Sequence, residues 1–306
     1  MKITRRQFLG TTSTVAAGAA FFPGALLWGD ESSTGMVVCQ LTNKTRSQMM
    51  SYIVKSASGK LLVVDGGCSG DADHLLEMLE KLNGAPNPKI AGWFLSHCHA
   101  DHICALCELI HTKRLPEVER IYFNFPSLEW LLENEASESR TTHTFHERIQ
   151  AVEDVVVKTK KDQKIVCDNI VVTILNDPHL EPRRNSINNS NVCFRFETPQ
   201  TSLVFLGDLG AEGSEKLLEV QPEALLRADA VQMAHHGQAG ATRELYATIA
   251  PKICFWPTPT WLWNNDRGQG VDSGPWTIRN EKRWMKELSV EAHYIGKDGT
   301  QSVEFA

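Results

Sequence analysis

Residues 96–102 read Ser-His-Cys-His-Ala-Asp-His and directly follow the apolar run Ala91–Leu95. A short apolar run of this kind is typical of a buried strand. Alternate positions on the loop after it can point the same way, so two histidines are placed to share one ion. The next two polar residues would then face a second ion. Imidazole and carboxylate ligands suit Zn²⁺, with Mn²⁺ or Fe as alternatives. The predicted ligands in this stretch are His97, His99, Asp101 and His102.

Three more short motifs place a carboxylate or an imidazole at the end of a predicted strand. Asp65-Gly66-Gly67 follows an apolar run, Gly207-Asp208 ends the predicted strand Ser202–Leu206, and His235-His236-Gly237 follows another run. Each motif alone is weak evidence for a particular function. Together with residues 96–102 they predict a centre assembled from several strand ends.

In this order the four motifs resemble those of the metallo-β-lactamase superfamily, and the resemblance covers nearly all of the chain after residue 36. It implies an α/β fold, a four-layer αββα sandwich. That agrees with the two groups of predicted strands with helices between them. It also implies two metal ions, with Asp208 bridging them and Asp65 orienting the metal loop by hydrogen bonding.

The adjacent histidines differ in their expected roles. The His-His-Gly form is similar to that of DNA-uptake-channel hydrolase domains and phosphorylcholine esterases. We expect His236 to bind metal and His235 to act on the substrate as an acid or oxyanion partner. The reverse assignment stays open, because strand alternation does not settle the register.

One expected ligand is missing from the pattern. The superfamily has another histidine, between the first cluster and the bridging aspartate, beside the pair at 97 and 99. No matching turn is present here. The two alternatives are His179, in the run Asn176-Asp177-Pro178-His179, and Asn189 or a neighbour in the polar run 188–191. We expect His143 and His146 to lie on the surface.

The ligand set predicts a hydrolase that needs no Ser or Cys nucleophile. Two ions about 3.5–4 Å apart would hold a hydroxide that Asp101 orients for attack on phosphorus or a carbonyl carbon. The His-His-Gly form favours a phosphodiesterase or phosphoesterase for a small-molecule or envelope-derived substrate. Hydrolysis of carboxylic esters, lactones or amides, β-lactams included, is one alternative. A non-enzymatic metal-binding protein is the other.

Residues 1–30 differ in composition from the rest of the chain. Arg5-Arg6 precede Phe8-Leu9 and an uncharged, weakly apolar stretch from Gly10 to Gly29. A basic segment before an apolar one is typical of an export signal, and paired arginines resemble the twin-arginine signal read by that export machinery. We expect a signal over 1–30, a hydrolase domain over 36–306 and a periplasmic or other extracytoplasmic location. The alternative is a membrane tether formed by an uncleaved leader.

Charge and cysteine content exclude other classes. Lys and Arg total 31 against 37 Asp and Glu, a formal net charge of −6. A protein that tracks along nucleic acid usually carries a basic stripe, so we expect no extended nucleic-acid binding.

The eight cysteines are scattered through apolar runs, and a chain of this size needs no disulfide framework. We expect most of them to act as small buried hydrophobes.

Several local expectations concern helices and loops. We expect helices over Asp71–Leu82, from residue 103 to about His111, over much of 127–160 and over Thr277–Leu288, and strand over Lys164–Leu175. The Trp- and Pro-rich loop 257–265 is predicted to pack as a cap. Its alternative role is an aromatic wall that binds a base, a sugar or a quaternary ammonium group.

Overall fold

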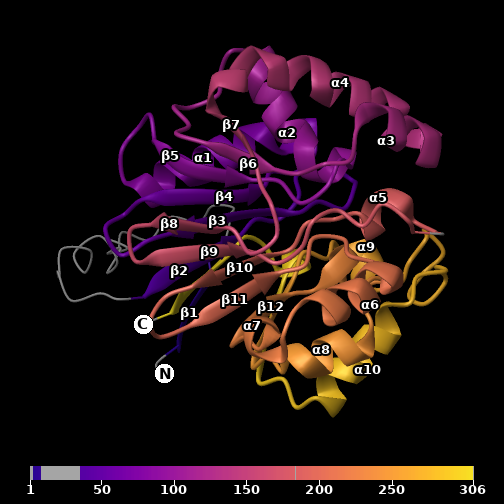
Figure 1. Ribbon diagram of the computed structural model, residues 1–306. Coiled ribbons are helices and arrows are strands. Elements are labelled where there is room, and N and C mark those ends of the chain that lie inside the picture. The colour runs from indigo at the N-terminus through magenta and orange to yellow at the C-terminus, as the bar shows by residue number, and fades with distance from the viewer. Residues whose placement is uncertain (1–2, 8–34, 183, 306) are drawn as a thin grey trace.

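The computed structural model describes residues 3–7, 35–182 and 184–305. Two β-sheets pack face to face, and helices cover the outer face of each (Figure 1). The predicted four-layer αββα sandwich is therefore confirmed.

The first sheet has eight strands in the described part of the chain, in the order β1-β15-β2-β3-β4-β5-β6-β7. Neighbours are antiparallel from β1 to β4 and parallel from β4 to β7. The strands are β1 (Ile3–Gln7), β2 (Met36–Gln40), β3 (Ser51–Lys55), β4 (Leu61–Asp65), β5 (Ile90–Phe94), β6 (Ile121–Phe123), β7 (Val156–Lys158) and β15 (Gln301–Phe305).

The second sheet runs in the order β14-β13-β12-β11-β10-β9-β8. It is antiparallel from β8 to β11 and parallel from β11 to β14. The strands are β8 (Lys164–Cys167), β9 (Ile170–Ile174), β10 (Phe194–Glu197), β11 (Ser202–Phe205), β12 (Ala230–Gln232), β13 (Ile253–Trp256) and β14 (Ala292–Ile295).

The helices divide between the two outer faces (Figure 1). Apolar side chains of the early helices pack on the first sheet, and those of the later helices pack on the second. The first group is α1 (Ala72–Asn83), α2 (Ala100–His111), α3 (Leu128–Asn134) and α4 (Ser139–Ile149). The second is α6 (Ala211–Val220), α7 (Glu223–Leu226), α8 (Arg243–Ile249), α9 (Thr260–Trp263) and α10 (Ile278–Glu287).

A third apolar cluster fills the space between the sheets, and Phe94 at the end of β5 is central to it. Its fully buried ring stacks on Tyr122, with 4.8 Å between ring centroids, and makes edge contacts with Phe194 and Phe196 of the opposite sheet. This packing anchors the end of β5, from which the residue 96–102 loop departs.

Some of the predicted helices and strands are present in the structure, and others differ from it. The helices expected over 71–82, 103–111 and 277–288 are present as α1, α2 and α10. The single strand expected over 164–175 is a hairpin, β8 and β9, because the chain turns at Asp168 with a positive φ of 57°. Residues 127–160 are helical up to Val155 but end in β7, and α6 was not predicted.

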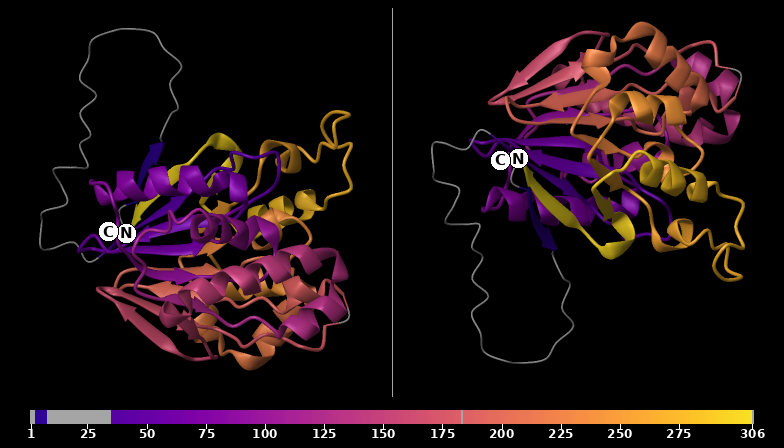
Figure 2. Two further views of the ribbon diagram at one scale, coloured as in Figure 1. Left: turned by 90° about the horizontal axis from the view of Figure 1, so that it is seen from above. Right: turned by 90° about the horizontal axis from the view of Figure 1, so that it is seen from below.

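The predicted signal falls mostly outside the described residues, which exclude 8–34. Residues 3–7 form β1, which lies along the edge of the first sheet beside β15 (Figure 2). Within the described ranges, no helix combines the length and apolar character needed to cross a bilayer. Export stays a prediction from the sequence of 1–30.

Replacing Phe94 tests the packing between the sheets. We expect Phe94→Ala to lower the free energy of unfolding by about 3–5 kcal/mol, because it opens a cavity between two sheets that cannot collapse fully. Phe94→Leu should cost less. Urea denaturation measures both, and Val166→Ala, at a site that is 71% exposed, is the control with little expected effect. A loss below about 1 kcal/mol for Phe94→Ala would contradict this role.

Candidate metal centre

Three loops at one edge of the sandwich converge on a cluster of imidazoles and carboxylates. His97 and His99 follow β5, and His99 is the N-cap of α2, whose first turn carries Asp101 and His102. Asp208 follows β11 from the other sheet. His236 lies in the 3-10 turn η4 (Ala234–Gly237) after β12.

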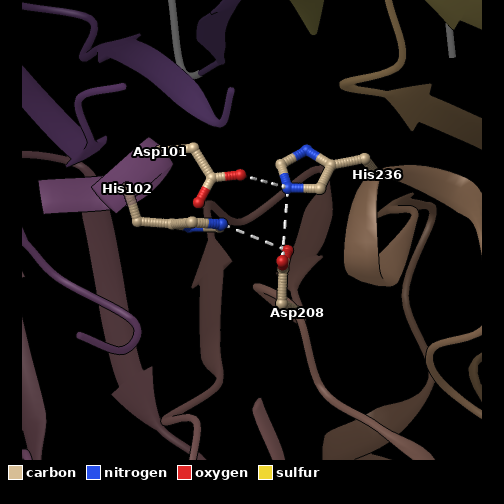
Figure 3. A group of neighbouring side chains, drawn as sticks. All are labelled: Asp101, His102, Asp208 and His236. Carbon is tan, nitrogen blue, oxygen red and sulfur yellow. Dashed lines mark ion pairs between the residues drawn. The ribbon is translucent and has the colours of Figure 1, made fainter. Parts of the chain in front are cut away.

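Figure 3 shows Asp208 between the imidazoles of the two sheets. Its Oδ1 lies 3.2 Å from His102 Nε2, and its Oδ2 lies 3.2 Å from His236 Nε2. His236 Nε2 is also 3.1 Å from Asp101 Oδ2. These four residues offer ligand atoms that all lie within 4.8 Å of one another.

A second group lies directly beside the first. His97 Nε2 is 3.0 Å from His99 Nδ1 and 4.0 Å from Asp208 Oδ2. Asp208 therefore belongs to both groups, the position expected of a carboxylate that bridges two ions. The two groups together fit a dinuclear metal site.

The hydrogen bonding of the cluster provides a test of that fit. Asp101 Oδ2, His102 Nε2, Asp208 Oδ1 and His236 Nε2 are all buried and, apart from their ion-pair contacts with one another, have no hydrogen-bond partner. Buried polar atoms in native proteins almost always have one. Four such atoms that point at one another are those a bound cation would satisfy, so the donor set fits divalent metal ions.

Asp65 and Ser96 set the tautomers of two histidines. Asp65 Oδ2 lies 2.7 Å from His102 Nδ1, so the neutral ring donates there and keeps the Nε2 lone pair for metal. The Ser96 hydroxyl donates to Asp65 Oδ2, and its oxygen can then accept from His97 Nδ1 at 3.0 Å. His97 also keeps Nε2 free. Asp65 thus takes the orienting position that the sequence predicted.

The other two histidines are oriented by different partners. The Pro257 carbonyl oxygen lies 3.2 Å from His236 Nδ1 and leaves Nε2 for metal. Glu135 Oε1 lies 3.2 Å from His99 Nε2, so this ring presents Nδ1 instead. Two imidazole nitrogens without protons, on His97 and His99, would then face each other at 3.0 Å. A cation between them removes that repulsion.

The charges of the cluster depend on one another. Burial alone raises the pKa of Asp208, but His236 and His102 outweigh it and hold that pKa well below its usual range. Burial likewise lowers the pKa of His236, yet Asp208 and Asp101 raise it to about 9. In the metal-free chain His236 therefore holds a proton at neutral pH. A metal ion must displace that proton, so its affinity should rise with pH.

Backbone geometry fixes two of the loops. Gly207 has a φ of +56°, and a Cβ there would collide with the side chain of Asn191, so only glycine fits before the bridging carboxylate. His235 and His236 are also left-handed, with φ of 50° and 55°. Such non-glycine strain persists where the surroundings enforce it. One restraint is the Tyr246 hydroxyl oxygen, which accepts from Ala234 N at 3.0 Å.

The cluster opens into a cavity of about 440 Å³. His235 lines this cavity but belongs to neither metal group, whereas His236 is fully buried within one. His235 Nδ1 lies 2.8 Å from the Ala239 carbonyl oxygen, which leaves Nε2 for a substrate. The two adjacent histidines therefore lie in different places, His236 within a metal group and His235 on the cavity wall, and their roles stay predictions.

Neither alternative for the missing histidine lies in position to bind metal, for two different reasons. Neither metal group contains His179, and this residue does not line the cavity. Asn189 is occupied, because its Oδ1 accepts from Gly213 N at 2.7 Å and its Nδ2 donates to the Arg184 carbonyl oxygen at 2.7 Å. Neither candidate named first from the sequence is therefore placed to complete the group of His97 and His99.

Sequence reasoning missed Glu135. It follows α3 in the segment expected to be helical, 36 residues from the histidine that it contacts, and no motif surrounds it. His143 and His146 lie on α4, outside both metal groups. No signal in the sequence separated Glu135 from the other acidic residues of that segment.

Most of the cysteines and of the tryptophans near residues 257–265 are packed inside the protein. All eight cysteines are free, six of them buried. Trp256 is buried and donates to His293 Nδ1 at 3.0 Å, and its ring meets Trp263 edge-on. Trp261 differs, because it lines the metal-site cavity and its buried Nε1 has no hydrogen-bond partner. Most of this segment therefore packs as the predicted cap, and Trp261 also contributes to the cavity wall.

Comparison with known proteins identifies the family to which the chain is similar. A family model described as the metallo-beta-lactamase superfamily matches residues 45–252. The metallo-beta-lactamase fold protein YhfI from Bacillus subtilis is 14% identical with a TM-score of 0.53, covering 87% of this chain and 98% of that one. Unliganded yeast PDE1 is 11% identical with a TM-score of 0.53, covering 90% and 100%.

CmlA, a diiron beta-hydroxylase from Streptomyces venezuelae, is 13% identical with a TM-score of 0.51, over 86% of this chain and 53% of that one. At these identities the solved structures show a shared fold alone. No curated protein has a matching sequence. The family model nevertheless spans more than half of the chain, and its range includes all four motifs. The protein belongs to the metallo-β-lactamase superfamily.

Proposed function

We propose that this protein is a dinuclear-metal hydrolase of small phosphodiesters or phosphomonoesters. The observation that carries the proposal is the buried set of unpartnered imidazole and carboxylate atoms at the floor of a cavity of about 440 Å³. A cavity of that size suits a small molecule. The fold does not decide the chemistry, since CmlA has the same fold and is a diiron beta-hydroxylase.

Features of the cavity favour a phosphoester. When bound, two divalent ions would supply a water nucleophile of lowered pKa and positive charge next to a phosphate oxygen. Trp261 lines the cavity and offers an aromatic surface to the substrate. No lysine or arginine of the described chain lines this cavity, whereas Glu135 and Glu138 do. That lining disfavours an extended polynucleotide.

Residues of the chain supply the other catalytic and positioning roles. Asp101, whose Oδ2 lies at the cluster, orients the attacking water. His235 lines the cavity, and the Ala239 carbonyl oxygen holds its Nδ1, so Nε2 is the nitrogen available to give a proton to the leaving oxygen. Asp65 and Glu135 hold His102 and His99 in their metal-binding tautomers.

Hydrolysis of bis(p-nitrophenyl) phosphate tests the substrate class. We expect turnover with Zn²⁺ or Mn²⁺, and at least a 100-fold loss in His97→Ala, because this imidazole belongs to one of the two metal groups. His179→Ala is the matched control and should keep wild-type turnover. If protein shown to hold two ions does not turn over this substrate, carboxylic esters, lactones and amides become the favoured substrates.

Changing Asp65 tests the tautomer argument. We expect Asp65→Asn to weaken metal binding by about 10–100-fold, because the amide can no longer accept reliably from His102 Nδ1. Equilibrium dialysis measures the affinity, and a thermal melt of the metal-free protein separates this effect from unfolding. Metal affinity equal to that of the wild type would show that Asp65 does not orient this ligand.

The proposed acid role of His235 predicts a dependence on the leaving group. We expect His235→Gln to slow an alkyl phosphodiester by about 10²–10⁴-fold, since an alkoxide needs a proton to depart. A p-nitrophenyl leaving group needs little such help and should be slowed far less. Metal content should not change. Equal losses on both substrates would assign His235 to binding instead of proton donation.

A further inference from the structure

The two metal groups differ in the number of ligands. Asp101, His102, Asp208 and His236 make one group of four, whereas the other has only His97, His99 and the shared Asp208. Catalytic zinc sites take three protein ligands and keep a fourth position open. The group of His97, His99 and Asp208 therefore has a position that one more ligand atom can fill.

Asn188 has the properties of the missing ligand. It is only 4% exposed, its Oδ1 is buried without a hydrogen-bond partner, and it lines the same cavity as His99 and Asp208. An unpartnered buried amide oxygen is costly. Asn188 Oδ1 shares this state with the four cluster atoms that have metal-binding geometry.

The neighbouring asparagines are committed elsewhere. Asn189 Oδ1 accepts from Gly213 N in α6, and its Nδ2 donates to the Arg184 carbonyl oxygen before α5. Asn191 Oδ1 accepts from Asp208 N at 3.2 Å, and its Nδ2 donates to the Leu206 carbonyl oxygen at 2.8 Å. Of the amides at 188, 189 and 191, only that of Asn188 has an oxygen left for a ligand.

Glu135 connects this segment to the group of His97, His99 and Asp208. Its Oε1 contacts His99, and its Oε2 accepts from Ile187 N at 3.2 Å. One carboxylate thus joins the short helix α5 (Ser186–Asn189), which carries Asn188, to the ring of a predicted ligand. The same contact fixes the tautomer of His99.

We propose that Asn188 Oδ1 binds the ion held by His97 and His99, in the place where an imidazole would complete the group. The proposal rests on the dinuclear centre of the proposed function. A neutral amide oxygen is a harder and weaker ligand than imidazole and suits ions such as Mn²⁺ better than Zn²⁺. The chain would then hold one ion tightly, at His102 and His236, and one weakly.

Metal titration of the full chain tests the assignment without any substrate. Mn²⁺ and Zn²⁺ binding is followed by equilibrium dialysis, and Co²⁺ binding by its visible absorption. We expect two unequal dissociation constants. Asn188→Leu should weaken the weaker site at least tenfold and leave the tighter one unchanged. Asn188→Asp should retain both ions, and Asn188→His should tighten the weaker Zn²⁺ site at least tenfold.

His179→Ala is the matched control and should bind both ions as the wild type does. Melting of the metal-free variants checks that each is folded. Wild-type affinity at both sites in folded Asn188→Leu would overturn the proposal, as would loss of one ion in His179→Ala. If Asn188→Leu does not fold, Asn188→His decides, and unchanged Zn²⁺ affinity overturns the assignment. Failure to hydrolyse phosphoesters would overturn the proposed function alone, since these readouts measure binding.

Discussion

The contact of the Asp208 carboxylate with imidazoles is the interaction on which the site depends. A buried carboxylate is costly unless it is paired, and this one lies 3.2 Å from His102 and 3.2 Å from His236. The partners come from different sheets, so the contact also joins the two halves of the sandwich. Gly207, which alone tolerates its left-handed backbone beside Asn191, sets the direction of the carboxylate.

The tautomers explain why the surrounding residues matter as much as the ligands. Asp65, Ser96, Glu135 and the Pro257 carbonyl each engage one ring nitrogen of a histidine. The nitrogens that remain all face the same small volume. A site arranged in this way is organised before the ion arrives, and its ligands need little rearrangement to bind. That organisation separates a metal centre from a chance gathering of polar side chains on a loop.

The fold alone does not identify the reaction that this protein catalyses. YhfI, yeast PDE1 and CmlA share the sandwich, and CmlA is a diiron beta-hydroxylase. The reaction therefore has to be argued from the cavity, whose wall includes Trp261 and where His235 lies outside both metal groups. His235, as a candidate proton donor to a leaving oxygen, suits a small phosphoester, and the acidic lining disfavours a polyanionic polymer.

The sequence by itself determined the layered fold, the position of residues 96–102 at a strand end and the motifs around Asp65, Asp208 and His236. These features are local, because apolar periodicity and dense ligand spacing appear within a few residues. Only the tertiary structure distinguished Asn188 from Asn189, placed Glu135 against His99 and left His179 aside. Those outcomes depend on which polar atoms find partners across 20 or more residues, as Asn189 does with Gly213 at a separation of 24. No local pattern encodes such pairing.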